Sequence, residues 1–165
     1  NPFLVDIGME NPTAKMTIGQ MSEVLFMLLL PLFFKKYGFK NTILVGMLAW
    51  ALRYVLFAFG DAGSNTYMLI FGIALHGICY DFFFVSGQIY TDAKADDSIK
   101  SAAQGLITLA TYGLGMLIGF WITGLFTDTY KGDWQTIWLF PAGFAVVILI
   151  LFGATFKHEP IAFKD

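Results

Sequence analysis

Charge is scarce in this 165-residue chain, in which 13% of the residues are charged, 57% are hydrophobic and the net charge is −2. Soluble domains contain about 25% charged and about 45–50% apolar residues, so this composition excludes an ordinary water-soluble domain. The largest basic group is Lys35, Lys36 and Lys40. Such a small group does not make the basic surface that nucleic acids require, so no nucleic-acid partner is expected.

Cysteine is also nearly absent, because Cys79 is the only one and lies within an apolar run. One cysteine excludes an internal disulfide and a paired-cysteine metal or redox site. His76 and Asp81 are close in sequence to Cys79, but positions i, i+3 and i+5 of one helix point apart, so no metal site is expected. Neither a nucleophile beside a base nor a metal triad is present, so the sequence predicts no cofactor and no enzymatic activity.

The chain lacks an initiating methionine and a signal peptide. Its first residues, NPFLVDIG, are typical of the end of another apolar segment. We therefore expect the chain to be an excerpt from a longer polypeptide, with residues 1–15 forming the end of a preceding transmembrane helix and an outer loop.

Long apolar runs dominate the remaining sequence. Five runs reach the length of about 20 residues that a helix needs to cross hydrocarbon, and they are 16–34, 41–60, 66–90, 102–126 and 134–156. Membrane β-strands alternate apolar and polar residues over about 10 positions, whereas FAVVILILFG is apolar on every side, which makes β structure the weaker alternative. The predicted fold class is therefore all-α, a polytopic membrane helical bundle.

Lysines are distributed unevenly between the segments that flank these five runs. Segments 35–40, 91–101 and 157–165 form one set, and segments 1–15, 61–65 and 127–133 form the other. The first set holds Lys35, Lys36, Lys40, Lys94, Lys100, Lys157 and Lys164, and the second holds Lys15 and Lys131. Because cytoplasmic loops are enriched in lysine and arginine, we expect the first set, including a tail at 157–165, to be cytoplasmic.

Ionisable residues inside the apolar runs are the best candidates for function, because each costs at least ~2.5–3.5 kcal/mol to insert into a membrane. These residues are Glu23, Arg53, His76 and Asp81. Gln20 precedes Glu23 by three residues and so lies near the same helix face, and Tyr80 follows His76 by four. We expect a water-filled cavity with hydrogen-bonding groups and an aromatic face, lined by Gln20, Glu23, His76, Tyr80 and Asp81.

The four ionisable residues also have simpler, structural interpretations. Arg53 is a structural charge if it pairs with a buried carboxylate and fixes helix register. His76 need only hydrogen-bond a neighbouring helix, and Glu23 lies near the outer headgroups if its span is shifted by one turn. Asp81 has the weakest structural alternative, because an unpaired carboxylate near the bilayer midplane is costly.

Three segments resemble a known family: GQMSEVLFMLLLPLFFKKYGFKN (19–41), HGICYDFFFVSG (76–87) and SAAQGLITLATYGLG (101–115). They are similar to the C-terminal half of major facilitator superfamily transporters, and most closely to bacterial nucleoside:proton symporters. The resemblance implies that the five runs are transmembrane helices 8 to 12 of a twelve-helix carrier. It also implies a partner in the missing N-terminal half and a multi-pass location in the bacterial inner membrane, with the C-terminus cytoplasmic.

The resemblance further implies roles for individual residues. Gln20 and Glu23 match positions that contact the ribose hydroxyls of a nucleoside. Tyr80 matches an aromatic position beside the base, and His76 matches a further contact position where relatives are expected to carry an aromatic residue. Asp81 matches a carboxylate implicated in substrate binding and proton coupling, with Glu23 as the second proton-coupling candidate.

Together these features predict secondary active transport of nucleosides by proton symport. Two alternatives remain open. The same carboxylate, amide and aromatic groups also suit a proton-coupled sugar or oligosaccharide symporter of the same superfamily. The second alternative is a membrane protein with a structural role and no transport activity.

Overall fold

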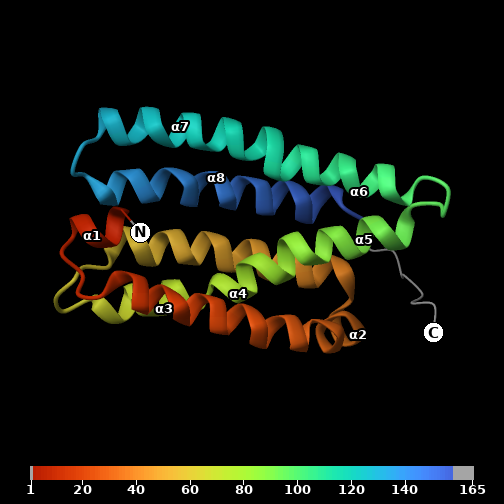
Figure 1. Cartoon of the computed structure of the whole chain (residues 1–165), viewed down its shortest axis with the longest axis horizontal. Helices are drawn as coiled ribbons and strands as arrows, with labels where there is room; N and C mark the ends of the chain where they lie inside the picture. Colours follow the sequence, from red (N-terminus) through yellow and green to blue (C-terminus); the bar gives the residue numbers. More distant parts are fainter. Residues whose placement is uncertain (1, 158–165) are drawn as a thin grey trace.

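The computed structural model describes residues 2–157, which form helices joined by turns with no β-strand in that range. The helices lie alongside one another in an elongated bundle (Figure 1). The segments long and apolar enough to cross a membrane are Pro12–Phe59, Thr66–Lys94, Lys100–Thr129 and Trp134–Thr155. The prediction of an all-helical membrane bundle is confirmed. The expected tail at 157–165 lies outside the described residues, apart from Lys157.

The chain starts with the short helix α1 (Pro2–Asp6) and continues into α2 (Pro12–Phe59), which has 48 residues. A straight helix of this length would measure about 72 Å, more than twice the thickness of the hydrocarbon layer. Gly38, with φ of 74°, is the residue inside α2 that leaves helical geometry, and the chain doubles back into two arms near its middle (Figure 1). This turn is tighter than the connection predicted at 35–40, because glycine adopts positive φ without strain.

The next membrane segment is an interrupted helix. It consists of α3 (Thr66–Ala74), α4 (His76–Cys79), the π-helix η1 (Tyr80–Val85) and α5 (Ser86–Lys94). The Ser86 hydroxyl donates to the Asp81 carbonyl at 3.0 Å and so satisfies a carbonyl of the widened turn. Such π turns are rare and occur frequently at functional sites.

The last two membrane segments form a hairpin. The first consists of α6 (Lys100–Thr108), the π-helix η2 (Leu109–Gly115) and α7 (Met116–Thr129), and the second is α8 (Trp134–Thr155). Asp133 caps α8, because its carboxylate accepts a hydrogen bond from the Thr136 N–H at 3.0 Å. Hydrogen bonding by the Thr136 side chain and by its N–H lowers the pKa of Asp133 below its ordinary value.

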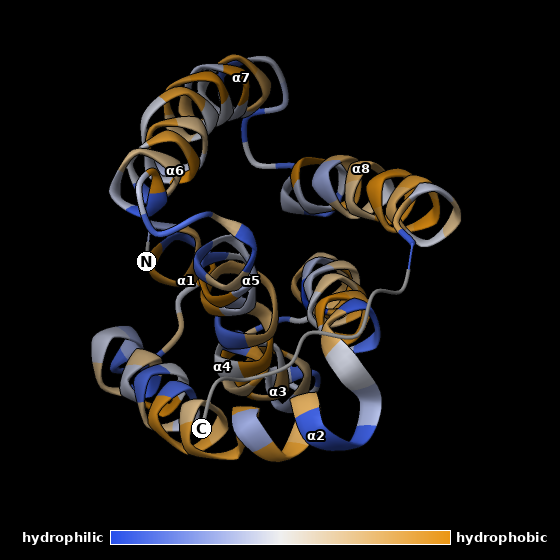
Figure 2. Ribbon diagram, turned by 90° about the vertical axis from the view of Figure 1, so that its right-hand side faces the viewer, coloured by the Kyte–Doolittle hydropathy of each residue, from blue (hydrophilic) through white to orange (hydrophobic). Residues whose placement is uncertain are grey.

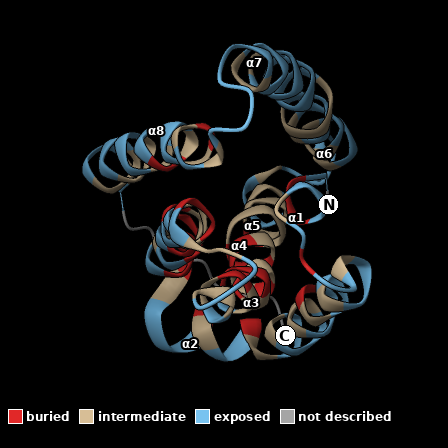
Figure 3. Cartoon of the chain, turned by 90° about the vertical axis from the view of Figure 1, so that its left-hand side faces the viewer, coloured by how far each residue is buried: buried red, intermediate tan, exposed pale blue. Residues whose placement is uncertain are grey.

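The core lies where α3, α4 and η1 cross the two arms of α2. Leu69, Cys79 and Phe82 are fully buried there. A Cβ on Gly46 would lie 2.8 Å from the Phe82 carbonyl carbon, so the second arm of α2 and η1 meet at backbone distance. Burial is concentrated in these elements and is sparse on α6 and α7 (Figure 3). The region around α4 is therefore the best-packed part of the chain.

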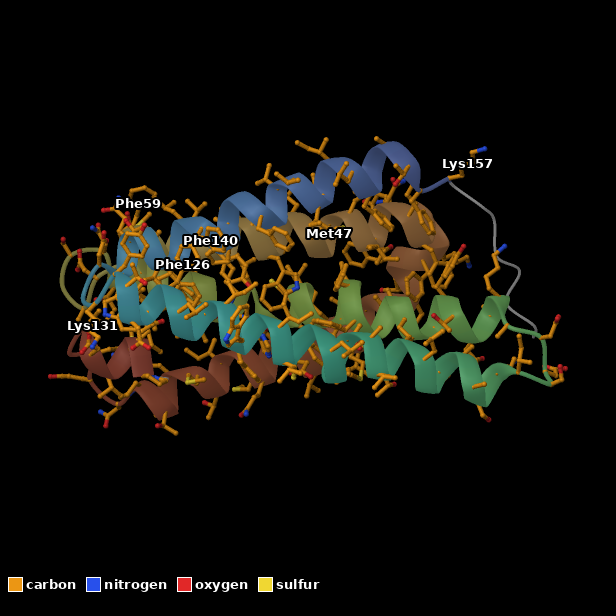
Figure 4. The ribbon with its side chains drawn as sticks, turned by 90° about the horizontal axis from the view of Figure 1, so that it is seen from above. Met47, Phe59, Phe126, Lys131, Phe140 and Lys157 are labelled. Carbon is orange, nitrogen blue, oxygen red and sulfur yellow. The ribbon has the colours of Figure 1, made fainter. Side chains whose placement is uncertain are left out.

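The outer helices expose apolar side chains. Leu117, Phe120 and Trp121 of α7 are all exposed. Hydrophobic residues make up much of α7 and α8 (Figure 2). Figure 4 shows Phe126 and Phe140 between these helices, where their rings stack with centroids 4.0 Å apart. Apolar residues on all sides of a helix suit a membrane rather than water.

Lys40 joins the turn within α2 to the end of α8, because its Nζ donates to the Gly153 carbonyl at 2.8 Å. Carbonyls in the last turn of a helix lack intrahelical partners and favour a cation. We expect Lys40→Met to destabilise the full-length protein by about 1.5–3 kcal/mol, measured as a lower midpoint of thermal unfolding in detergent. Lys131→Met, at an exposed turn, is the control, and equal midpoints for the two variants would contradict this prediction.

Candidate functional site

A pair of hydrogen bonds at Ser22 fixes the first arm of α2 against the α3–α4 junction. The Ser22 hydroxyl donates to the Ala74 carbonyl at 2.6 Å and accepts from the Gly77 N–H at 2.9 Å. A Cβ on Gly77 would lie 2.5 Å from the main-chain carbonyl carbon and oxygen of Ser22. The two helices therefore touch at backbone distance, which only glycine allows at this position.

This contact brings Glu23 and His76, the chain neighbours of Ser22 and Gly77, to face each other. The distance from His76 Nε2 to Glu23 Oε2 is 3.7 Å. The side chains are 32% and 28% exposed respectively, so both remain accessible from one side. The structure thus brings together two residues that the sequence places 53 positions apart.

Arg53, from the second arm of α2, lies on the other side of the imidazole. Its Nη1 is 2.7 Å from His76 Nδ1. Its guanidinium lies over the rings of Trp50 and Phe57, at 5.7 and 5.3 Å from their centroids. One interpretation of the sequence paired Arg53 with a buried carboxylate. In the structure Arg53 instead hydrogen-bonds His76, because the imidazole lies between the guanidinium and Glu23.

A cavity of about 220 Å³ opens beside this row of side chains. Gln20, Arg53 and His76 contribute its polar groups, and Phe57 and Trp138 contribute aromatic walls. An amide, a guanidinium and an imidazole facing aromatic surfaces are suited to a flat polar organic molecule. Gln20 and His76 therefore line the same cavity.

Tyr80 continues the site toward the fourth membrane segment. Its ring lies 5.9 Å from the His76 ring, and its hydroxyl is 2.7 Å from the Tyr112 hydroxyl. Tyr80 begins η1 and Tyr112 lies within η2, so the two π-helices meet at this contact. Sequence reasoning did not select Ser22, although it lies within the motif GQMSE. Tyr112 is one of several polar residues in its span, and no local pattern distinguishes it from the others.

Asp81 occupies a different environment from the one expected. The residue is fully buried, and neither carboxylate oxygen has a hydrogen-bond partner among the described residues. The sequence predicted that Asp81 lines a water-filled cavity. In this conformation it instead packs in the core with Cys79 and Phe82, because η1 directs this face toward α2. Glu23 still acts on Asp81 electrostatically.

Comparison with known proteins places this chain in a transporter family. The family model described as Nucleoside H+ symporter matches residues 1–160. The chain belongs to this family. The resemblance identified from the three sequence segments is therefore confirmed.

Two Escherichia coli proteins illustrate the similarity of this chain to known proteins. YegT of Escherichia coli K12 is 41% identical over 96% of this chain and 40% of its own length. The xanthosine permease of the same organism is 34% identical over 99% of this chain and 43% of its own length. The chain thus spans about two fifths of the length of these relatives.

The crystal structure of the nucleoside transporter NupG superimposes with a TM-score of 0.82 at 36% identity, over 90% of this chain and 38% of NupG. An aspartate-to-alanine mutant of NupG superimposes with a TM-score of 0.85 at 34% identity, over 95% of this chain and 40% of that structure. The helical arrangement described above is therefore similar to that of the matching part of NupG.

Proposed function

We propose that the full-length protein containing this chain takes up nucleosides together with protons across the bacterial inner membrane. The observation that carries the proposal is the group formed by Glu23, His76 and Gln20 beside the Tyr80 ring. Family membership supports the same substrate class. The activity is transport rather than catalysis.

The chemistry of a nucleoside matches this group. A nucleoside carries several hydroxyls and a flat heterocycle, so its site needs hydrogen-bond acceptors and an aromatic face. In our proposal the Glu23 carboxylate accepts from ribose hydroxyls, and the Gln20 amide donates and accepts beside it. Tyr80 supplies the ring against which the base packs, and His76 supplies a further polar contact.

Proton coupling is proposed to use the two carboxylates. Asp81 and Glu23 lie on elements that pack against each other, and the Glu23 charge acts on the Asp81 carboxyl group. Like charges repel at membrane depth, where water screens them poorly, so a proton on one carboxylate removes a repulsion. We assign the proton to Asp81, which is buried without a hydrogen-bond partner in the described structure. Glu23 then remains the group that holds hydroxyls.

The rest of the transporter completes the mechanism. We propose that this chain lies in the C-terminal half, that the N-terminal half closes the site from the other side, and that the C-terminus is cytoplasmic. The two halves then rock about a site near the bilayer midplane to expose it to each side in turn. One charge crossing the membrane gains about 2.3 kcal/mol per 100 mV, which supports accumulation of substrate.

Uptake by the full-length protein in proteoliposomes tests this proposal. Radiolabelled uridine is expected to accumulate when the outside is more acidic than the inside, and unlabelled nucleosides are expected to compete. Competition by sugars instead of nucleosides would favour a sugar symporter. Absence of both accumulation and counterflow would contradict a transport function.

Replacing Glu23 with glutamine tests the proposed hydroxyl anchor. A hydrogen bond to a charged group contributes about 1.5–3 kcal/mol, so we expect the KM for uridine to rise roughly 10- to 100-fold. Asp128→Asn is the matched control, because it makes the same carboxylate-to-amide change at an exposed position of α7. An unchanged KM in Glu23→Gln would exclude this residue from the substrate site.

A further inference from the structure

We infer that Arg53 is a positioning residue that holds His76 in one neutral tautomer, with the proton on Nε2 and directed at Glu23. The inference rests on the proposed function, because it treats Glu23 as the group that binds substrate hydroxyls. Arg53 acts through the imidazole, which lies between its guanidinium and the Glu23 carboxylate. By fixing the tautomer of His76, Arg53 determines whether the imidazole offers Glu23 a neutral N–H or a charged one, without touching the substrate itself.

The hydrogen bond between Arg53 and His76 has one possible direction. A guanidinium carries five N–H donors and no acceptor, so at 2.7 Å the Arg53 Nη1 must donate and His76 Nδ1 must accept. An Nδ1 that accepts carries no proton. The neutral imidazole therefore has its proton on Nε2, and His76 cannot become an imidazolium while this hydrogen bond remains.

On the opposite side of the ring, this tautomer directs the Nε2 proton of His76 at the Glu23 carboxylate. His76 Nε2 faces Glu23 Oε2 at 3.7 Å, which is too long for a hydrogen bond but needs only a small movement to become one. A neutral donor at this position orients the carboxylate and leaves its remaining lone pairs free for substrate. An imidazolium would pair with Glu23 more strongly and compete with substrate hydroxyls.

Arg53 is held where it can perform this role. Its guanidinium lies against the Trp50 and Phe57 rings, and the Cys79 thiol and Tyr54 interact with it as well. The charged and titratable groups around His76 come from several of the described elements. Glu23 and Arg53 lie on the two arms of α2, Cys79 and Tyr80 follow His76 along its own segment, and Asp81 is buried next to Tyr80. Glu23 and Arg53 are the two that face the imidazole nitrogens.

The decisive variant is Arg53→Gln in the full-length transporter. Glutamine has a carbonyl that accepts, so His76 Nδ1 becomes free to carry a proton, and histidine ordinarily titrates near pH 6.5. We expect the ratio of the variant's KM for uridine to the wild-type KM to rise about tenfold as the pH on both sides falls from about 7.5 to about 5.5. A constant ratio would overturn the inference.

Two further variants separate positioning from a general loss of structure. Arg53→Lys keeps a group that only donates, so its KM ratio to wild type is expected to stay independent of pH. In Arg53→Gln/His76→Gln the residue that gains the proton is gone, so the pH dependence of the ratio is expected to disappear. Persistence of that dependence in the double variant would show that another group titrates, and would overturn the inference.

The tautomer is also observable without transport. Full-length protein labelled with ¹⁵N-histidine is expected to show one histidine with unprotonated Nδ1 and protonated Nε2, and this signal is expected to be absent from His76→Gln. A protonated Nδ1 would overturn the inference even if nucleoside uptake is normal. Conversely, failure of wild-type uptake with the expected tautomer present would contradict the proposed function alone.

Discussion

Replacing Asp81 with asparagine should abolish uphill nucleoside uptake by the full-length transporter while downhill counterflow persists. Asparagine has nearly the shape of aspartic acid but neither binds nor releases a proton in the physiological range. The variant is therefore expected to exchange nucleoside across the membrane without coupling to the proton gradient. Its accumulation ratio under an inward proton gradient should fall to unity.

The measurement is uridine accumulation in proteoliposomes with an imposed pH gradient, followed by counterflow at equal pH. Asp128→Asn, which makes the same chemical change on the exposed surface of α7, should accumulate uridine like the wild type. Accumulation by Asp81→Asn at the wild-type level would show that another group carries the proton. Loss of counterflow as well would place Asp81 in substrate binding rather than in coupling alone.

The position of Asp81 explains why so large an effect is expected. The residue is fully buried and its carboxylate oxygens have no hydrogen-bond partner in the part of the chain described. An unpaired charge in such a place costs several kcal/mol. In the proposed mechanism, a conformational change that opens this position to water changes the cost of the charge and so links proton binding to alternating access.

The second large effect is expected from Gly77→Ala. The added Cβ would lie 2.5 Å from the main chain of Ser22, so the first arm of α2 and α4 must separate. Forced overpacking typically costs about 1–3 kcal/mol, and here it also breaks the hydrogen bonds of Ser22 that hold Glu23 opposite His76. We expect a lower unfolding midpoint in detergent and at least a tenfold loss of uridine kcat/KM.

Two controls make the Gly77 result specific. Gly119→Ala adds the same methyl group to a helix position where nothing lies within 4 Å of the new Cβ, so both readouts should stay at wild-type values. Ser22→Ala combined with Gly77→Ala should not restore function, because backbone atoms as well as the hydroxyl block the new methyl group. Wild-type uptake by Gly77→Ala would show that the helices separate here without consequence for the site.

Much of the site is predictable from sequence because lipid makes polar residues costly. Glu23, Arg53, His76 and Asp81 stand out for their charge or polarity inside apolar runs. Their pairing is not predictable in the same way. A carboxylate was one partner considered for Arg53, whereas in the structure Arg53 hydrogen-bonds His76, because the approach of helix arms distant in sequence decides which side chains are neighbours.

The local backbone geometry of the helices was also not predictable from the sequence. The π-helices η1 and η2 bring the Tyr80 and Tyr112 hydroxyls together, yet each lies in a run whose apolar pattern predicts an ordinary helix. The single-residue turn at Gly38 shortened a connection expected to span 35–40. In both cases packing between segments selects a backbone geometry that the hydrophobic pattern does not encode.

The sequence by itself determined the helical class, the membrane environment, the family and the small set of polar residues worth examining, because hydrophobic length and the cost of buried charge are readable from composition and spacing. Only the tertiary structure decided that Ser22 and Gly77 bring Glu23 to His76, that Arg53 lies behind the imidazole, and that Asp81 is buried. Those outcomes depend on contacts between helices far apart in the chain, where backbone approach and hydrogen-bond direction determine the neighbours of each side chain.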